Sequence, residues 1–242
     1  MDSVYEKKFK IEPWQVDRFQ RLRTSEMAKL FQIAAIEHTE SLGAGREYTL
    51  DKGLLWIVSR IKVSVKRPLV YGEKVVFKSW PLETMHVIFP RCYSIETEEG
   101  DEIIKASSLW MLIDSNNRKM VFPDEYNITI PADNGMPQYP SPADLVPFEG
   151  TSWGSRTIEY TDLDLNGHVN NTTYFDWVDS IHNEEWHKNH FYSDFQMNFR
   201  KELSGYESPC IYSEETNDVL RVKGLSRDKD VFAFQAKVSE IL

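Results

Sequence analysis

Cysteine is scarce in this sequence, which has 242 residues and only two cysteines, Cys92 and Cys210. They provide neither a disulfide framework nor a CxxC metal site, so we expect a reducing compartment, with the cytoplasm as the default. Long apolar runs are absent as well, and none approaches the ~20 residues that a membrane-spanning helix needs. The first ten residues are charged and lack an apolar h-region, so we expect no signal peptide.

Positive charge is in deficit, with 28 Lys and Arg against 38 Asp and Glu and a net charge of −10. A negative field of this size disfavours nucleic acid and anionic membranes as partners. The sequence has no Gly-rich phosphate loop and no GxSxG elbow, which excludes the α/β-hydrolase route to ester cleavage. Three histidines occur in HNEEWHKNH (182–190), but His182 and His187 fall on different helix faces. We therefore expect neither a metal site nor a cofactor.

Proline is concentrated in the middle of the chain, where six of the eleven lie between Pro123 and Pro147. The segment has no helical or alternating pattern and is typical of an extended connector. We predict a first unit over residues 1–122, a Pro-rich linker over 123–149 and a second unit over 150–242.

The two halves show the same order of predicted elements. Apolar residues at helical spacing predict one helix that begins near Ser25 and ends at Gly43. A second helix is expected after Asn171, preceded by a strand that starts at Arg156. Further strands are expected over residues 56–65, 74–80, 87–96 and 103–113, and over 195–201, 211–216, 219–224 and 231–238.

Superposing the helices at Phe31 and Phe175 relates the halves by an offset of 144 residues. We expect an α+β fold in which each helix is wrapped by its own curved antiparallel sheet. Each helix is apolar over a broad face, as a wrapped helix must be.

Polar residues gather in TDLDLNGHVNN (161–171). Asp164, Asn166 and His168 alternate, so in an extended chain all three would point to one face. Asn166-Gly167 can bend the chain, and Asn170 or Asn171 can cap the following helix. Backbone N–H groups at such a place can stabilise a developing oxyanion.

The first half lacks this polar set. At the 144 offset, Asp164 is opposite Gln20, Asn166 opposite Leu22 and His168 opposite Thr24. We therefore expect a duplicated fold with one catalytic site, in the second half. The first half would shape the cavity for an apolar ligand, with Ala34 or Ala35 facing it.

The segment DLDLNGHVNNTTYFDWV resembles the active-site segment of acyl-acyl-carrier-protein thioesterases, which have a double hotdog fold. Further similarity lies in LFQIAAIEHTESLGAG, LLWIVSRIKVSVKRPLVYGEKVVFKSWP, ASSLWMLIDSNNRKMVFPDE and FRKEL. The resemblance implies two tandem hotdog units, the first binding the acyl chain and the second catalytic. It also implies that the substrate is acyl carrier protein with a phosphopantetheine-linked acyl chain, from which free fatty acid is released in fatty acid biosynthesis.

The resemblance further implies catalytic roles for Asp164, Asn166, His168 and Glu202. In plant relatives a Cys follows the Glu, whereas this sequence has Leu203. A cysteine nucleophile is therefore not expected, and hydrolysis by carboxylate-activated water remains. Either Glu202 or Asp164 can serve as the base, and direct attack by a carboxylate to give an anhydride is also open.

Several alternatives stay open at this point. The donor can be acyl-coenzyme A instead of a carrier protein. The protein can also be a hotdog hydratase, although that motif spaces His further from Asn, or a module that only binds acyl ligands. The oligomeric state is open, with a homodimer as one option. Of Trp56, Trp80 and Trp110, candidates for an acyl tunnel together with Met85 and Phe89, we expect at least two to be ordinary core residues.

Overall fold

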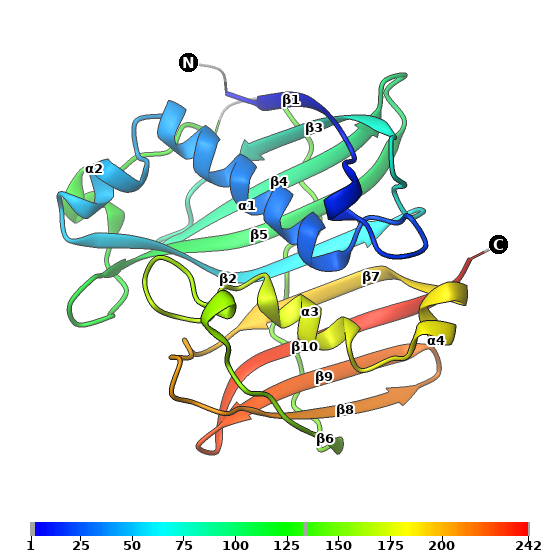
Figure 1. Ribbon diagram of the computed structural model, residues 1–242. Helices are drawn as coiled ribbons and strands as arrows, with labels where there is room; N and C mark the ends of the chain where they lie inside the picture. Colours follow the sequence, from blue (N-terminus) through cyan, green and yellow to red (C-terminus); the bar gives the residue numbers. More distant parts are fainter. Residues whose placement is uncertain (1–2, 133–134, 242) are drawn as a thin grey trace.

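A computed structural model describes residues 3–132 and 135–241 (Figure 1). Its strands form one antiparallel sheet in the order β1-β3-β4-β5-β2-β7-β10-β9-β8-β6. The first half contains β1 (Tyr5–Lys10), α1 (Thr24–Ser41), α2 (Arg46–Leu50), β2 (Leu54–Val65), β3 (Lys74–Pro81), β4 (Ile88–Thr97) and β5 (Glu102–Asp114). The second half contains β6 (Thr151–Ser155), α3 (Thr173–Asp179), α4 (Glu184–Asn189), β7 (His190–Phe199), β8 (Cys210–Thr216), β9 (Val219–Ser226) and β10 (Lys229–Glu240). Short 3-10 helices span Pro13–Gln15, Pro123–Tyr126 and Tyr160–Asp162.

The two halves are arranged symmetrically about the centre of the sheet. Strands β2 and β7 pair there, from Arg60 opposite Asn198 to Ser64 opposite Asp194. Outward from this pair, the order β5-β4-β3-β1 on one side matches β10-β9-β8-β6 on the other. The α+β class is confirmed, but the expectation of a separate sheet for each helix is wrong. Because β2 and β7 satisfy each other's backbone groups, neither half leaves an open edge at the centre.

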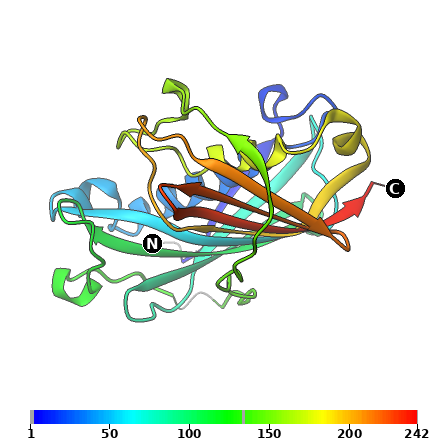
Figure 2. The same ribbon diagram turned by 90° about the horizontal axis from the view of Figure 1, so that it is seen from below.

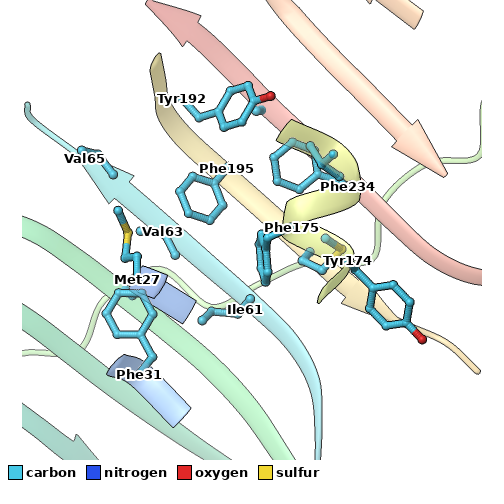
Figure 3. Packing of buried hydrophobic residues seen from close by; sticks show 14 of the residues in the cluster. Met27, Phe31, Ile61, Val63, Val65, Tyr174, Phe175, Tyr192, Phe195 and Phe234 are labelled. Carbon is cyan, nitrogen blue, oxygen red and sulfur yellow. The ribbon is translucent and has the colours of Figure 1, made fainter. Parts of the chain in front are cut away.

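Both central helices lie on the same face of the sheet (Figures 1 and 2). In α1, Met27, Phe31, Ala34, Ala35 and His38 are buried at helical spacing, so one stripe of the helix faces the sheet. Helix α3 has only seven residues, so the long helix that we expected in each half is present only in the first half. Figure 3 shows Met27 and Phe31 of α1 on the same side of β2 as Ile61 and Val63, with Phe175 of α3 near Phe195 and Phe234.

The Pro-rich segment crosses the other face of the sheet. Its carbonyl groups accept hydrogen bonds from Trp80 Nε1 at 2.9 Å (Pro137 O), Ser107 Oγ at 2.6 Å (Pro140 O) and Lys223 Nζ at 2.5 Å (Phe148 O). These side chains belong to β3, β5 and β9, so the segment runs from the first half to the second. We propose residues 123–149 as the linker between the two units.

Several predicted element ends differ from the structure; β7, for example, begins at His190, five residues before the predicted start at residue 195. Helix α1 begins at Thr24 with Arg23 in the N-cap position, not Ser25, whereas Gly43 follows the helix with a φ of +79°, as expected of a helix stop. The strand predicted from Arg156 is wrong, because the edge strand β6 ends at Ser155. Its residues are mostly exposed and show no apolar alternation, so the pattern gives no strand prediction there.

Candidate active site

Residues 164–168 form a tight turn and not an extended segment, and Asn166-Gly167 bends the chain there as expected. Asp164 Oδ1 accepts the backbone N–H of Asn166 at 2.8 Å and that of His168 at 3.2 Å. Asp164 N–H donates to His168 O at 2.7 Å, and Gly167 completes the turn with a φ of +76°. The short carboxylate competes with extended backbone by bonding its own N–H groups, as Asp commonly does. The turn places Asn166 and His168 side by side at the cavity described below.

The first half contains the same turn, built on Asp17. Its Oδ1 accepts the N–H groups of Phe19 at 2.8 Å and Arg21 at 2.9 Å, and Gln20 takes the positive φ of +63° that Gly167 takes in the second half. The matching pairs 17 and 164, 20 and 167, and 21 and 168 all differ by 147. The predicted offset of 144 is therefore wrong, and with it the counterparts Gln20, Leu22 and Thr24.

The loop that carries Glu202 is also duplicated. Leu69 O accepts the N–H of Leu22 at 2.8 Å, and Leu203 O accepts the N–H of Val169 at 2.9 Å. In each half, an ion pair between two residues six positions apart brackets this leucine. The pairs are Arg67 with Glu73 at 2.6 Å and Lys201 with Glu207 at 2.8 Å. In this register Pro68 stands where the second half has Glu202. The first half thus carries Phe19, Arg21 and Pro68 in place of Asn166, His168 and Glu202, so the expected loss of the polar set is seen, although Asp17 is retained.

The carboxylate of Glu202 lies between an arginine and a histidine. Arg118 Nε donates to Glu202 Oε2 at 3.2 Å, and Arg118 Nη2 donates to Oε1. His168 Nδ1 is 3.9 Å from Oε1. Arg118 comes from the turn after β5 in the first half, so the two halves meet at this carboxylate. The sequence gives no sign of this contact, because 84 residues separate the partners and no local pattern links them.

All four predicted residues, Asp164, Asn166, His168 and Glu202, line one cavity of about 300 Å³. The opposite wall belongs to the first half. Helix α1 contributes four residues at positions i, i+3, i+4 and i+7, which share one helix face. They are Gln32, Ala35, Ile36 and Thr39. The cavity therefore joins a polar end in the second half to a groove formed mainly by the first.

Aromatic side chains form much of that groove. Trp56 and Trp110 both line it, so the expectation that at least two of the three tryptophans are ordinary core residues is wrong. Phe89 also lines the groove and packs edge-on against Trp56 at a centroid distance of 4.7 Å. Trp80 is fully buried elsewhere, and Met85 is 51% exposed and lines none of the described cavity.

The groove is also lined by a buried guanidinium, that of Arg91. Arg91 lines the cavity, and its Nη1 lies 2.9 Å from His38 Nδ1 and donates to Ser79 Oγ at 3.0 Å. Burial lowers the pKa of Arg91. Near the polar end, burial raises the pKa of Tyr174, and neighbouring carboxylates, Glu202 first, act in the same direction. Its hydroxyl therefore stays protonated.

The backbone N–H groups before α3 are mostly occupied. Val169 N–H donates to Leu203 O and Asn170 N–H to Asp162 O, at 2.9 and 2.8 Å, so these two do not form the expected oxyanion site. Asn170 Oδ1 accepts the N–H of Thr172 at 3.0 Å, but Thr172 itself holds the N-cap position of α3, so the expectation that Asn170 or Asn171 caps this helix is wrong. Asn171 also lines the cavity, and its backbone N–H donates to no acceptor among the described residues.

A second cavity of about 380 Å³ occupies the equivalent place in the other half of the sheet. Its lining includes Asp17, Arg21 and Pro68, the counterparts of Asp164, His168 and Glu202. Asp179 faces it where Gln32 faces the first cavity, again 147 residues apart. The backbone of the site is thus present twice, whereas the set of Asn, His and Glu side chains is present once.

The remaining groups of chemical interest are separate from this site. Cys92 is fully buried and Cys210 partly buried, and both are free thiols outside the cavity lining. Within the described ranges, no three His, Cys, Asp or Glu side chains are grouped in a way that could hold a metal ion. None of the helices there has the length and hydrophobicity to cross a lipid bilayer.

Comparison with known families matches both halves of the chain. The family profile described as acyl-ACP thioesterase N-terminal domain matches residues 2–128, and that described as acyl-ACP thioesterase C-terminal domain matches residues 152–225. A dodecanoyl-[acyl-carrier-protein] hydrolase of Umbellularia californica is 26% identical over 216 residues, which are 83% of this chain and 56% of that protein. An oleoyl-acyl carrier protein thioesterase of Arabidopsis thaliana is 23% identical, over 72% of this chain and 53% of that protein. The chain spans about half the length of the curated relatives it matches.

Solved structures show the same fold over the whole chain. An acyl-ACP thioesterase from Bacteroides thetaiotaomicron superposes with a TM-score of 0.89 at 20% identity and covers 98% of each chain. A 12:0-ACP thioesterase from Umbellularia californica gives a TM-score of 0.84 at 19% identity, over 100% of this chain and 99% of that one. The predicted double hotdog architecture is confirmed by these two likenesses.

Proposed function

The chain belongs to the acyl-ACP thioesterase family, and on that premise we propose that it hydrolyses the thioester of acyl-acyl carrier protein and releases a free fatty acid. One observation carries the proposal: Asn166, His168 and Glu202 line the same cavity as the apolar wall of α1. A thioester at the polar end would have its carbonyl among these groups and its acyl chain along the groove. A reaction of this kind belongs to fatty acid biosynthesis.

Glu202 is our proposed general base. A water molecule that bonds to Glu202 Oε1 and to His168 Nδ1, 3.9 Å apart, would be held by both groups at once. Glu202 would take the proton of this water as its oxygen attacks the thioester carbon. The resulting tetrahedral intermediate then expels the thiolate of the phosphopantetheine arm. Leu203, the residue that follows Glu202, is fully buried and offers no nucleophile.

Asp164 has a different role in this proposal. Its Oδ1 is occupied by two backbone N–H groups, and Asp17 makes the same turn in the half that lacks the other polar residues. We therefore assign Asp164 to holding the turn that positions Asn166 and His168. The amide of Asn166 and the N–H of Asn171 would donate to the oxyanion, because both line the cavity.

The acyl carrier protein is the proposed partner, with its phosphopantetheine-linked chain entering at the polar end. Arg46, Arg200 and Lys201 line the same cavity and provide positive charge for an acidic carrier. Arg200 and Lys201 already pair with Asp144 and Glu207, which leaves Arg46 as the cation of this set without an ion pair among the described residues. We expect the enzyme to work in the cytoplasm, and a homodimer is compatible with the proposal.

The test is a turnover assay of the purified protein with acyl carrier protein and coenzyme A thioesters of the same saturated chains. Faster release of free acid from the carrier thioester supports the proposal. A preference for the coenzyme A thioester would identify coenzyme A as the donor instead. An enoyl thioester that yields a 3-hydroxyacyl product without free acid would indicate a hydratase. Glu202→Gln should lose most hydrolysis, whereas the matched control Glu214→Gln, an ion-paired glutamate outside both cavities, should not.

A further inference from the structure

We propose that Arg118 is a positioning residue for hydrolysis, which fixes the carboxylate of Glu202 so that Oε1 faces His168. This inference rests on the proposed function, because it assigns Arg118 a role only through Glu202. The contact is bidentate, with Nε on Oε2 at 3.2 Å and Nη2 on Oε1. A guanidinium forked onto a carboxylate sets the plane of that carboxylate as well as its position. Each oxygen keeps one lone pair free, and Oε1 lies 3.9 Å from His168 Nδ1.

The turn after β5 is built to present Arg118. Asp114 Oδ1 accepts the N–H groups of Asn116 and Asn117, both at 2.9 Å, and Asn117 Oδ1 accepts that of Lys119 at 2.8 Å. These bonds lower the pKa of Asp114, with the one from Asn117 acting most strongly. Arg118 itself has a φ of +60°, an uncommon conformation for a residue other than glycine, and its N–H donates to Asp114 O at 3.0 Å. The backbone of the turn is thus fixed independently of Glu202.

Glu202 needs an external support of this kind. Its neighbour Leu203 is anchored, since it is fully buried and its carbonyl accepts the N–H of Val169. The Glu202 side chain, in contrast, is 43% exposed and has three torsions that nothing in the backbone fixes. In the described part of the chain its only polar side-chain contacts are with Arg118 and His168. Lys201 is directed to Glu207 instead and is not available as a substitute.

Loss of the bidentate contact between Arg118 and Glu202 should therefore lower kcat and leave KM nearly unchanged. Misplacement of a reacting group by about 1 Å can cost ~100-fold in rate, so we expect a loss of about 10- to 100-fold in Arg118→Gln. Arg118→Lys should be impaired by a similar factor, because one ammonium group keeps the charge but cannot bind both oxygens in a plane. In Arg118→Ala, added methylguanidinium should restore part of the lost kcat.

Two controls separate positioning from other roles. Arg67→Gln removes an equally bidentate pair, with Glu73, that lies outside both cavities, and it should leave kcat unchanged. Each variant is assayed with acyl carrier protein and with the small thioester acyl-pantetheine. A positioning role lowers kcat on both substrates by the same factor. Circular dichroism and thermal melting verify that Arg118→Gln is folded.

Three results would overturn the inference while the wild-type enzyme remains active and Glu202→Gln inactive. The first is full activity in Arg118→Gln. The second is a raised KM confined to the carrier substrate, which would make Arg118 a docking residue. The third is wild-type kcat in Arg118→Lys, which would make charge alone sufficient. Absence of thioester hydrolysis in the wild type would instead refute the proposed function, so the two failures are distinguishable.

Discussion

Replacing Ala35 by leucine should shorten the acyl chain that the protein prefers. Ala35 is 4% exposed and lines the cavity beside Ile36, whereas the neighbouring Ala34 is fully buried and does not line it. The larger side chain would therefore occupy groove volume that the distal part of a long acyl chain would otherwise fill. Acyl chains too short to reach Ala35 should keep their wild-type kcat/KM.

The size of the effect follows from the carbon atoms involved. Leucine has three more carbons than alanine and would displace about two to three chain methylenes. Each methylene kept from apolar surroundings costs ~0.8 kcal/mol. The loss for a long chain is then roughly 1.6–2.4 kcal/mol, or about 15- to 60-fold in kcat/KM.

The assay measures kcat/KM over a series of saturated acyl carrier protein thioesters for the wild type and for Ala35→Leu. Ala34→Leu serves as the control, because overpacking there should lower stability by about 1–3 kcal/mol without changing the length profile. Ile36→Ala should act in the opposite sense and favour longer chains, since Ile36 also lines the groove. A loss in Ala35→Leu that is equal at every length, or a profile identical to that of the wild type, would refute this account of the groove.

Glu202→Gln should lower kcat by about 10²–10⁴-fold, and Asp164→Asn, whose amide oxygen can still accept the two turn N–H groups, should lose at least tenfold less. Equal losses in steady-state kinetics would return Asp164 to the list of candidate bases. Cys92→Ser and Cys210→Ser should keep wild-type kcat, since neither thiol lines the cavity, and inactivation by a thiol reagent that depends on Cys210 would contradict this. Burial raises the pKa of Asp179 to about 7, above the unfolded value of ~3.9, so stability should fall as the pH rises from about 4 through 7. Asp179→Asn should remove most of that slope in urea titrations at several pH values, and an unchanged slope would disprove it.

Local patterns were sufficient for most strands but not for the shared sheet. Alternation and β-branched residues located the core strands within two residues for β2, β3, β4 and β5. Pairing between β2 and β7 depends on hydrogen bonds between residues that are 130 or more positions apart, and no local pattern encodes it. The polar edge strand β6 was missed for the opposite reason, because an exposed edge needs no apolar face.

The error in the repeat offset has a simple physical origin. The offsets 144 and 147 differ by three residues, which is close to one helical turn, so an apolar helix stripe matches almost equally well in either register. The turns before the helices carry better information. Glu12 and Gln15 form reciprocal hydrogen bonds, as do Glu159 and Asp162, and an Asp follows two residues later in each half. That polar spacing, E-x-x-[QD]-x-D, fixes the register in the sequence itself.

The corrected register changes which of the four predicted residues we expect to take part in the reaction. The resemblance to the family implies a catalytic role for all four of Asp164, Asn166, His168 and Glu202. The repeat separates them, because Asp17 survives in the first half and Asn166, His168 and Glu202 have no counterpart of their kind. A residue retained in both halves is explained by what both halves need, which is the turn.

The same comparison explains why two halves are needed for one site. The second half supplies the polar turn and Glu202, yet the wall opposite them is α1 of the first half. Arg118, also from the first half, holds the carboxylate on which we propose the reaction depends. Because β2 and β7 join the halves into one sheet, these parts keep a fixed relation. A substitution in the first half can therefore alter the preferred acyl-chain length through Ala35 and the rate through Arg118. Neither change replaces any of the four predicted catalytic residues.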